Sequence, residues 1–392
     1  MDQTYAEPKS ASESKSASVA REPPSLPGQV VLIFQGGGAL GAYQGGAYQA
    51  LHEAAIEPQW VVGTSIGAIN AAIIAGNDTA ARLDHLREFW ERIRWKPLWG
   101  DTPFGNLGGH AAAYFMTIIN GISGYYAPNP EVAWGLNARL GIEHAAFYTV
   151  EELRKTVSNV VDFDRIAAKF MRLTVGAVNV RTGKMRYFDS RNMRIALDHV
   201  LASGALPPSF PAIRIDGDPY WDGGLYSNTP VEVVFDDEPR RDSVVFAVQI
   251  FPIAGPEPES VWQVLSRQKD IQFASRADSH VSRQEQIHRL RHMVRELASR
   301  LPESERSSSE VREIARYGCG TCMHIVRINA TAPKDEDYFR DIDFTADGIR
   351  RRWQAGYADT MRTLERRPWE IPVDPMVGVA VHDSDALDRR RA

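Results

Sequence analysis

The feature that most constrains the fold is a pair of short apolar runs, each of which ends in a glycine-rich turn. Val30–Phe34 runs into Gly36-Gly37-Gly38, and Trp60–Val62 runs into Gly63-Thr64-Ser65-Ile66-Gly67. A helical pattern of residues follows each turn. Strands that alternate with helices imply crossover connections and a parallel sheet with helices on both faces. The sequence therefore predicts an α/β fold with a mainly parallel central sheet.

Further elements are spread along the chain, so the predicted sheet spans most of it. Additional strands are predicted at Leu173–Val178, Met185–Phe188, Val244–Phe251 and His324–Ile328, with a hairpin at 213–218. From residue 261 to about 317 the chain is strongly charged with helical spacing, and it is interrupted at Leu301-Pro302. This pattern predicts two surface helices joined by a loop.

The composition is that of an ordinary folded protein. Hydrophobic residues make up 43% and charged residues 24% of the 392 residues, which argues against a disordered or collagen-like chain. The net charge of −5 argues against binding to nucleic acid. No apolar run reaches the roughly 18 residues of a transmembrane helix, but contact with a membrane surface stays open. With two cysteines and no secretory signal, we expect a cytoplasmic protein.

Residues 89–148 are rich in aromatic side chains. They include Trp90, Trp95, Trp99, Phe104, Tyr114, Phe115, Tyr125, Tyr126 and Trp134. One interpretation is that these rings pack an inserted helical subdomain. The other is that they cap an apolar substrate channel, because ligand pockets are lined mainly by hydrophobic and aromatic side chains.

Three glycine-containing motifs carry the chemistry. Gly63–Gly67 has the Gly-x-Ser-x-Gly form, in which a sharp turn between strand and helix exposes the hydroxyl of Ser65. Gly36–Gly38 opens a helix directly after a strand, lacks the Lys-Ser/Thr ending of a phosphate-binding loop, and could form an oxyanion hole from backbone amides. Trp221-Asp222-Gly223-Gly224 supplies a carboxylate that could accept the proton of Ser65.

With these motifs in this order, the chain resembles the patatin-like phospholipase family. The resemblance extends to Gly45–Leu51 and Ala202–Pro211 and covers about Val30–Val234, and the region beyond Val261 resembles the extra segment of a bacterial subgroup. It implies a three-layer α/β/α sandwich and a serine acyl hydrolase that cleaves carboxylic esters of lipids. No metal site is predicted, and no metal or organic cofactor is required.

The resemblance also implies a role for each motif residue. Ser65 would be the nucleophile and Asp222 the general base. The oxyanion hole would be built from Gly36, Gly37, Gly38 and Gly41, with support from Gly63, Gly67, Gly223 and Gly224. One departure is Leu40, which stands where many members of the family carry Arg or Lys, and this puts any preference for substrate charge in doubt.

The predicted organisation has four parts. They are a disordered tail (1–29), a patatin-like catalytic domain (30–260) with a helical insertion at about 89–148, a charged helical C-terminal segment with a late strand (261–370), and a second tail (371–392). The predicted partner is a lipid or other ester substrate, with peripheral membrane contact left open. The head group, acyl length, protein partners and oligomeric state are not predicted.

Several alternatives stay open. The same dyad could serve an acyltransferase or an esterase for short esters or polyester oligomers, and a non-catalytic protein-binding scaffold is the other class. A Ser-Asp-His triad would use His280, His288, His292 or His324 as its base. Cys319 and Cys322 could be half of a zinc site, with histidines such as His288 or His292, or a redox pair, but their position before a strand favours two ordinary thiols.

Overall fold

The centre of the computed structural model, which describes residues 25–96, 119–331 and 339–383, is a nine-stranded sheet. The strand order is β11-β10-β9-β1-β2-β5-β8-β7, and β6 also pairs with β5. The strands are β1 (Gln29–Phe34), β2 (Trp60–Gly63), β5 (Arg172–Asn179), β6 (Met185–Asp189), β7 (Ile213–Ile215), β8 (Asp218–Asp222), β9 (Ser243–Gln249), β10 (Met323–Asn329) and β11 (Val379–Asp383).

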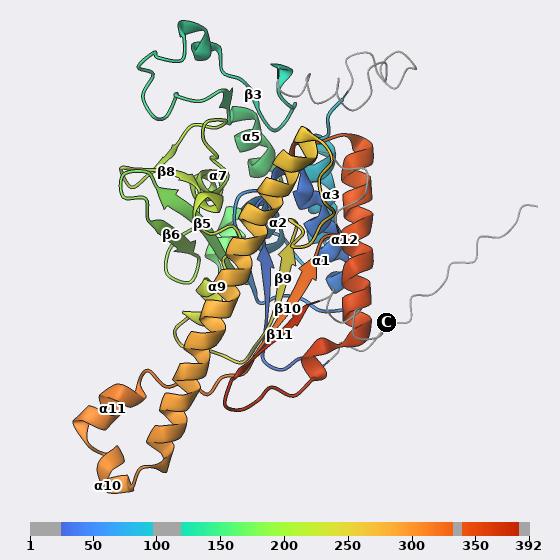
Figure 1. Cartoon of the computed structure of the whole chain (residues 1–392). Coiled ribbons are helices and arrows are strands. Elements are labelled where there is room, and N and C mark those ends of the chain that lie inside the picture. Colours follow the sequence, from blue (N-terminus) through green and yellow to red (C-terminus); the bar gives the residue numbers. More distant parts are fainter. Residues whose placement is uncertain (1–24, 97–118, 332–338, 384–392) are drawn as a thin grey trace, which may run out of the picture.

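Helices lie on both faces of this sheet (Figure 1). They are α1 (Ala42–Glu53), α2 (Ile66–Ala75), α3 (Arg82–Arg92), α5 (Glu151–Val160), α6 (Phe163–Ala167), α7 (Leu197–Ser203), α8 (Glu232–Phe235), α9 (Val261–Arg300), α10 (Glu303–Arg306), α11 (Ser309–Ala315) and α12 (Ala346–Arg366). None of the helices in the described ranges is long and apolar enough to cross a membrane.

Two hydrophobic cores flank the sheet, and the alternation of side chains along β1 divides them. Leu32 and Phe34 belong to a large core that includes residues of α1, α2 and α7, whereas Val31 and Ile33 belong to a second core. The second core contains residues of α8 and α9, among them Phe235. Successive residues of a strand face opposite sides of a sheet, so this division confirms the three-layer α/β/α sandwich.

The sheet is parallel from β11 to β5, which confirms the predicted mainly parallel pairing. Beyond β5 the pairing becomes antiparallel, because β5 pairs with β6 and β8, and β7 forms a hairpin with β8. This antiparallel end places the chain after β8 beside the carboxyl end of β2.

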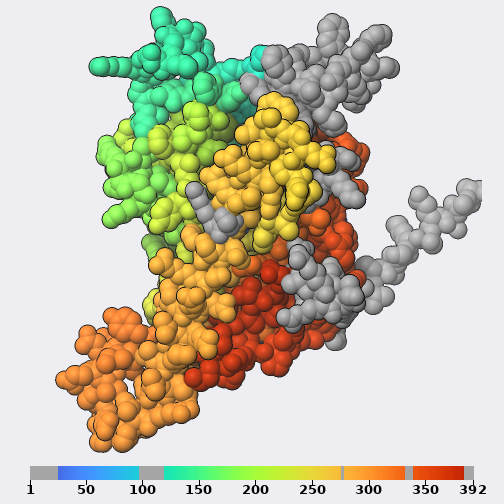
Figure 2. Space-filling view, in the orientation of Figure 1, coloured from blue at the N-terminus to red at the C-terminus, as the bar shows by residue number. Residues whose placement is uncertain are grey.

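The C-terminal segment packs on both layers of helices. α12 lies against α1 at very short range, since a Cβ atom at Gly46 would stand 1.8 Å from the Trp353 carbonyl oxygen. A Cβ atom at Gly356 would likewise stand 1.9 Å from the carbonyl oxygen of Tyr43. The long helix α9 crosses the other face and extends beyond it to α10 and α11, as Figure 1 shows, and Figure 2 shows it as a ridge on the surface.

Some expectations for the ends and the insertion need correction. The predicted second tail is not a tail throughout, because β11 pairs in parallel with β10 at the edge of the sheet. Residues 97–118 of the insertion lie outside the described residues, and 119–148 form mostly turns and a short ribbon rather than the expected helices. Residues 1–24 and 384–392 of the predicted tails also lie outside the described residues.

Candidate active site

Ser65 occupies a sharp turn between β2 and α2. Its backbone has φ 57° and ψ −128°, a conformation that costs a non-glycine residue strain and that marks functional turns. The Ser65 amide donates to both the carbonyl oxygen and the hydroxyl of Ser203, at 3.1 Å each. The Ser203 hydroxyl in turn donates to the carbonyl oxygen of Gly176 at 2.7 Å. The strained turn is therefore held by hydrogen bonds that Ser65 donates to Ser203 of α7, which is itself bonded to Gly176 of β5.

The two flanking glycines are required by close packing. A Cβ atom at Gly63 would lie 2.3 Å from the Gly67 carbonyl oxygen, and one at Gly67 would lie 2.5 Å from the carbonyl oxygen of Phe34. Side chains at either position would force the strand and helix apart. This explains the Gly-x-Ser-x-Gly spacing in physical terms.

The pairing register of β2, β5 and β8 places Asp222 near Ser65. Gly63 pairs with Val175 of β5, and Ala177, two residues further along, pairs with Asp222 of β8. Ser65 is also two residues beyond Gly63, so it lies level with Asp222 at the same end of the sheet. Ser65 and Asp222 both line one cavity, and the Ser65 hydroxyl is near enough to the Asp222 carboxylate to lower the pKa of that group as a hydrogen-bond donor.

The surroundings of Asp222 give it the properties of a base. It is 2% exposed, and burial raises the pKa of its carboxyl group to about 7, against the opposing effect of hydrogen bonds from Ser65 and the Gly224 amide. The amide of Gly224 donates to the carboxylate Oδ1 at 2.7 Å and fixes its orientation. A pKa near neutrality is what a general base needs.

A contrasting buried carboxylate shows that this environment is specific. Arg172 and Arg191 hold Asp237 by hydrogen bonds, and these charges lower the pKa of Asp237 despite its burial. Among the described residues, no such cation lowers the pKa of Asp222.

In the glycine loop, Gly36–Gly38, the backbone of Gly36 is hydrogen-bonded within the protein, whereas Gly37 and Gly38 line the cavity beside Ser65. The Gly36 amide donates to the carbonyl oxygen of Asn228 at 3.3 Å, and the Asn228 side chain donates back to the Gly36 carbonyl oxygen at 3.0 Å. Gly37 and Gly38 adopt φ 159° and 56° and line the cavity beside Ser65. Gly41 does not line the cavity; a Cβ atom there would lie 2.7 Å from Ile66.

Ser65 and Asp222 open onto a cavity of about 430 Å³. Its walls combine the motif residues with rings from the aromatic insertion and with residues of the C-terminal segment. The lining residues are Gly36, Gly37, Gly38, Ser65, Tyr125, Tyr126, Tyr148, Gly204, Leu206, Ser209, Phe210, Asp222, Gly224, Leu225, Asn228, Phe251, Gln272, Phe273, Asp341, Ile342 and Phe344. None of these described residues is a histidine, which disfavours the triad alternative.

Rings from separate segments form the aromatic wall. Tyr125 contacts Phe344 of the C-terminal segment and Phe210, with ring centroids 5.2 and 6.3 Å apart. Tyr126 contacts Tyr148 at 4.6 Å. Burial and the Asp222 charge raise the pKa of Tyr125 well above its usual value, so its phenol is neutral. The described part of the insertion therefore contributes to an apolar cavity, as the cap interpretation expected. Trp134 lies away from it and is exposed.

Two groups of residues at the site were not predicted from the sequence. Ser203 and Asn228 position the motifs, and Ser203 lies within the Ala202–Pro211 stretch that the resemblance already included. The other group is the wall formed by α9 and η4 (Arg340–Ile342), for which no sequence signal was present. Leu40 is buried beside Arg340, Arg351 and Arg352, so three cations of the C-terminal segment lie near the position where a cation was noted as missing.

Comparison with known proteins decides the family. A family model described as "Patatin-like phospholipase" matches residues 32–235, more than half of the chain, and one described as "Patatin phospholipase" matches residues 271–376. The chain belongs to the patatin-like phospholipase family. This patatin-like phospholipase is accordingly a lipid acyl hydrolase, and the second match confirms that its C-terminal segment is part of the resemblance.

Solved structures give more distant similarities. VipD from Legionella pneumophila aligns with a TM-score of 0.37 and 16% identity, over 86% of this chain and 67% of that chain. The type III effector protein ExoU aligns with a TM-score of 0.32 and 13% identity, over 90% of this chain and 55% of ExoU, so the chain spans about half of ExoU. A search of curated proteins found no match. The assignment of this patatin-like phospholipase rests on the two family models.

Proposed function

We propose that this patatin-like phospholipase cleaves carboxylic esters of lipids through a Ser65–Asp222 dyad. The observation that carries the proposal is the pairing of a strained, partly exposed serine with a buried carboxylate that no described cation neutralises. The proximity of the Ser65 hydroxyl to the Asp222 carboxylate and the pKa of about 7 for Asp222 support a nucleophile and its base.

The reaction has two halves. Asp222 accepts the hydroxyl proton as Ser65 Oγ bonds to the carbonyl carbon, and the amides of Gly37 and Gly38 stabilise the resulting oxyanion. The carbon–oxygen bond of the ester then breaks, and the alcohol leaves with the proton from Asp222. Water next attacks the acyl-enzyme and gives a proton to Asp222. The bond between the acyl carbon and Ser65 Oγ then breaks, and Asp222 returns the proton to Oγ, which releases the carboxylic acid and restores Ser65.

The aromatic cavity supports an apolar acyl group as the part of the substrate nearest Ser65. Its volume of about 430 Å³ lies in the range of sites for small ligands. Apolar side chains such as Phe210, Phe251 and Phe273 line it. These walls favour an acyl chain over a charged head group, because burying a charge without a partner is costly.

The test is hydrolysis of p-nitrophenyl esters from acetyl to palmitoyl by the wild type, Ser65→Ala and Asp222→Asn. We expect wild-type activity that increases with acyl length. Ser65→Ala should lower kcat at least about 1,000-fold, and Asp222→Asn about 100- to 10,000-fold. Asp218→Asn is the matched control, because Asp218 is on the same strand but pairs with Arg181 away from the cavity.

Each alternative gives a distinct result. Activity on short esters alone would replace the lipid assignment with an esterase. Consumption of ester without release of free acid, when an acceptor alcohol is supplied, would indicate acyl transfer. A folded wild type with no activity on any ester would contradict the proposal, and near wild-type turnover by Asp222→Asn would remove Asp222 from the dyad.

A further inference from the structure

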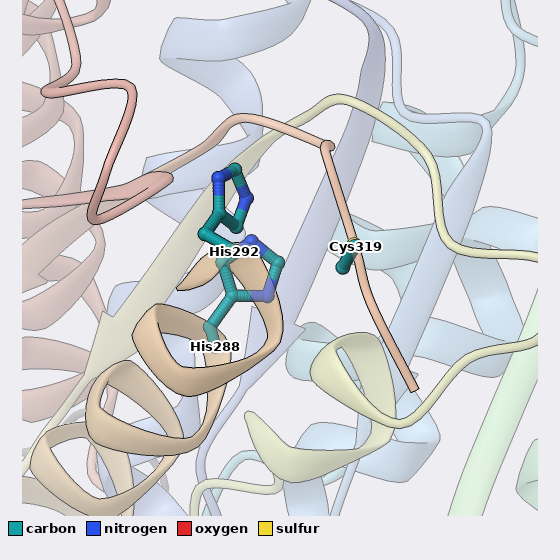
Figure 3. A group of neighbouring side chains, drawn as sticks. All are labelled: His288, His292 and Cys319. Atoms are coloured by element: carbon teal, nitrogen blue, oxygen red, sulfur yellow. The ribbon is translucent and has the colours of Figure 1, made fainter. Parts of the chain in front are cut away.

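Two histidines and a cysteine meet at a buried point far along the chain from the catalytic motifs. His288 and His292 are one helical turn apart on α9, and Cys319 lies in the segment before β10. Their exposed fractions are 0%, 7% and 6%. One ligand atom from each lies within 4.8 Å of the other two. Figure 3 shows the two imidazole rings next to one another, with Cys319 on the segment that passes them.

The sequence spacing adds a fourth residue. His288 and His292 form a His-x₃-His pair, and Cys319 and Cys322 form a Cys-x₂-Cys pair. Structural zinc sites with two cysteines and two histidines use these spacings. Cys322 lies three residues after Cys319, in the same short segment before β10. Both cysteines are free thiols.

The hydrogen bonds of His292 point to a cation. Both of its ring nitrogens lie 2.9 Å from carbonyl oxygens, Nδ1 from that of Pro375 and Nε2 from that of Thr321. A neutral imidazole has only one N–H group, so it can donate to only one of these acceptors, and both are satisfied only by a second proton on the ring or by a cation bound at the other nitrogen. If Nδ1–H donates to Pro375, the lone pair of Nε2 is directed inward. Metal-bound histidines usually have this outer hydrogen bond to a carbonyl oxygen.

His288 adds an unsatisfied group. Its Nε2 lies 2.9 Å from the same carbonyl oxygen of Thr321, and its buried Nδ1 has no hydrogen-bond partner among the described residues. Two imidazoles thus converge on one carbonyl oxygen, beside the Cys319 sulfur. Buried polar groups in native proteins are rarely left in this state.

We propose that His288, His292, Cys319 and Cys322 bind one Zn²⁺ ion in a structural site. Around tetrahedral zinc the ligand atoms would be about 3.3 to 3.8 Å apart, given Zn–N near 2.0 and Zn–S near 2.3 Å. The ligand atoms of His288, His292 and Cys319 lie within 4.8 Å of one another, so shifts of about 1 Å bring these three to this spacing. Cys322, from the same short segment as Cys319, would complete the set. The two thiolates balance the charge of the ion, and the four ligands leave no open position, which is the arrangement of a structural site rather than a catalytic one.

Such a site would join three separate segments. α9 contributes the histidines, the chain entering β10 contributes the cysteines, and the turn before β11 contributes the Pro375 carbonyl oxygen. A Cβ atom at Gly378, in the same turn, would lie 2.1 Å from His292 Nε2, so this turn packs directly on the site. The metal would fix α9, whose other half includes Gln272 and Phe273 of the catalytic cavity.

The test is metal content and affinity of the full-length chain, expressed without a polyhistidine tag. We expect the wild type, purified with added zinc, to hold about one zinc ion per chain by mass spectrometry. His292→Ala and Cys319→Ser should lower the affinity about 100-fold or more. His280→Gln, on the same helix but paired with Glu232, is the matched control and should bind as the wild type does. Circular dichroism checks that each variant is folded.

Two further measurements test the zinc site even if one of these variants fails to fold. Cobalt added to the wild type should give a thiolate-to-cobalt charge-transfer band and the visible absorption of a tetrahedral site, and Cys322→Ser should weaken the band. His288→Cys should retain the ion, because it exchanges one zinc ligand for another. A wild type that takes up no zinc, or uptake that is equal in all variants, would overturn the proposal. Neither result depends on ester hydrolysis.

Discussion

The region from β1 to β9 and the segment from α9 to β11 both line the cavity at Ser65, but they do so in different ways. The first region supplies Ser65, Asp222 and the glycine loop, whose backbone conformations are demanding and therefore leave motifs in the sequence. The second supplies part of the wall, in which Phe273 and Phe344 contact other aromatic rings of the cavity. The candidate catalytic residues therefore lie in local sequence motifs of the first region, whereas the shape of the cavity depends on both regions.

The largest expected effect comes from the point where the two regions touch. Gly38 has φ 56°, and a Cβ atom there would lie 2.3 Å from the Asp341 carbonyl oxygen of the C-terminal segment. Gly38→Ala should therefore displace the oxyanion loop and lower kcat about 100- to 1,000-fold, as expected for a lost oxyanion donor. The measurement is steady-state hydrolysis of a p-nitrophenyl ester.

Gly183→Ala is the control for backbone strain alone. Gly183 has a similar φ of 65°, but a Cβ atom there would meet no described neighbour within 4 Å. Its substitution should leave kcat close to the wild-type value. Equal activity of Gly38→Ala and Gly183→Ala would show that contact between the two regions does not support catalysis.

A second prediction separates the wall from the chemistry. Phe273 packs on Phe251 with ring centroids 4.7 Å apart and lines the cavity. Phe273→Ala should raise KM for long-chain esters about 10-fold or more, because apolar contact with the acyl chain is lost, and should change acetyl ester hydrolysis little. Phe170→Ala, which removes an exposed ring, is the control. An equal loss of activity on esters of all acyl lengths would contradict this role and would indicate that Phe273 supports the positions of Ser65 and Asp222.

The third prediction concerns pH. The proposed dyad needs ionised Asp222, whose pKa is about 7, so kcat/KM should fall about 10-fold for each pH unit below 7. Because Asp222 belongs to the first region, a substitution in the second region should not change this pH dependence. The pH at which kcat/KM is half-maximal should be the same for Phe273→Ala and the wild type. A profile that is flat between pH 5 and 8 would contradict the assignment of Asp222 as base.

The smallest expected effect is on stability. The pKa of Asp222 is about 7 in the folded chain and about 3.9 when unfolded, so the folded state binds more protons between these values. Stability should therefore fall as pH rises through this window, and the loss is complete above pH 7. Asp222→Asn should raise Tm by a few degrees more at pH 8 than at pH 4, measured by calorimetry. A Tm difference that does not change with pH would contradict this linkage.

The features of the fold and of the site that could be predicted from the sequence are those whose geometry only particular residue types allow. Gly63 and Gly67 are imposed by contacts under 3 Å, so the turn around Ser65 is recognisable from its spacing. Buried parallel strands also leave continuous apolar runs, as in β1. The cavity wall at Phe344 and the pairing of β11 depend on tertiary packing over long separations, which leaves no local pattern. For the same reason, the sequence favoured ordinary thiols at Cys319, whereas the structure brings two histidines to it.

In the proposed dyad, Asp222 activates Ser65. The most direct measurement is the rate of fluorophosphonate labelling of the wild type and Asp222→Asn, with the modified residue located by peptide mass spectrometry. We predict a single adduct on Ser65 in the wild type and a rate that falls about 100-fold or more in the folded variant. An adduct on a different serine, or equal rates in the two proteins, would contradict the dyad.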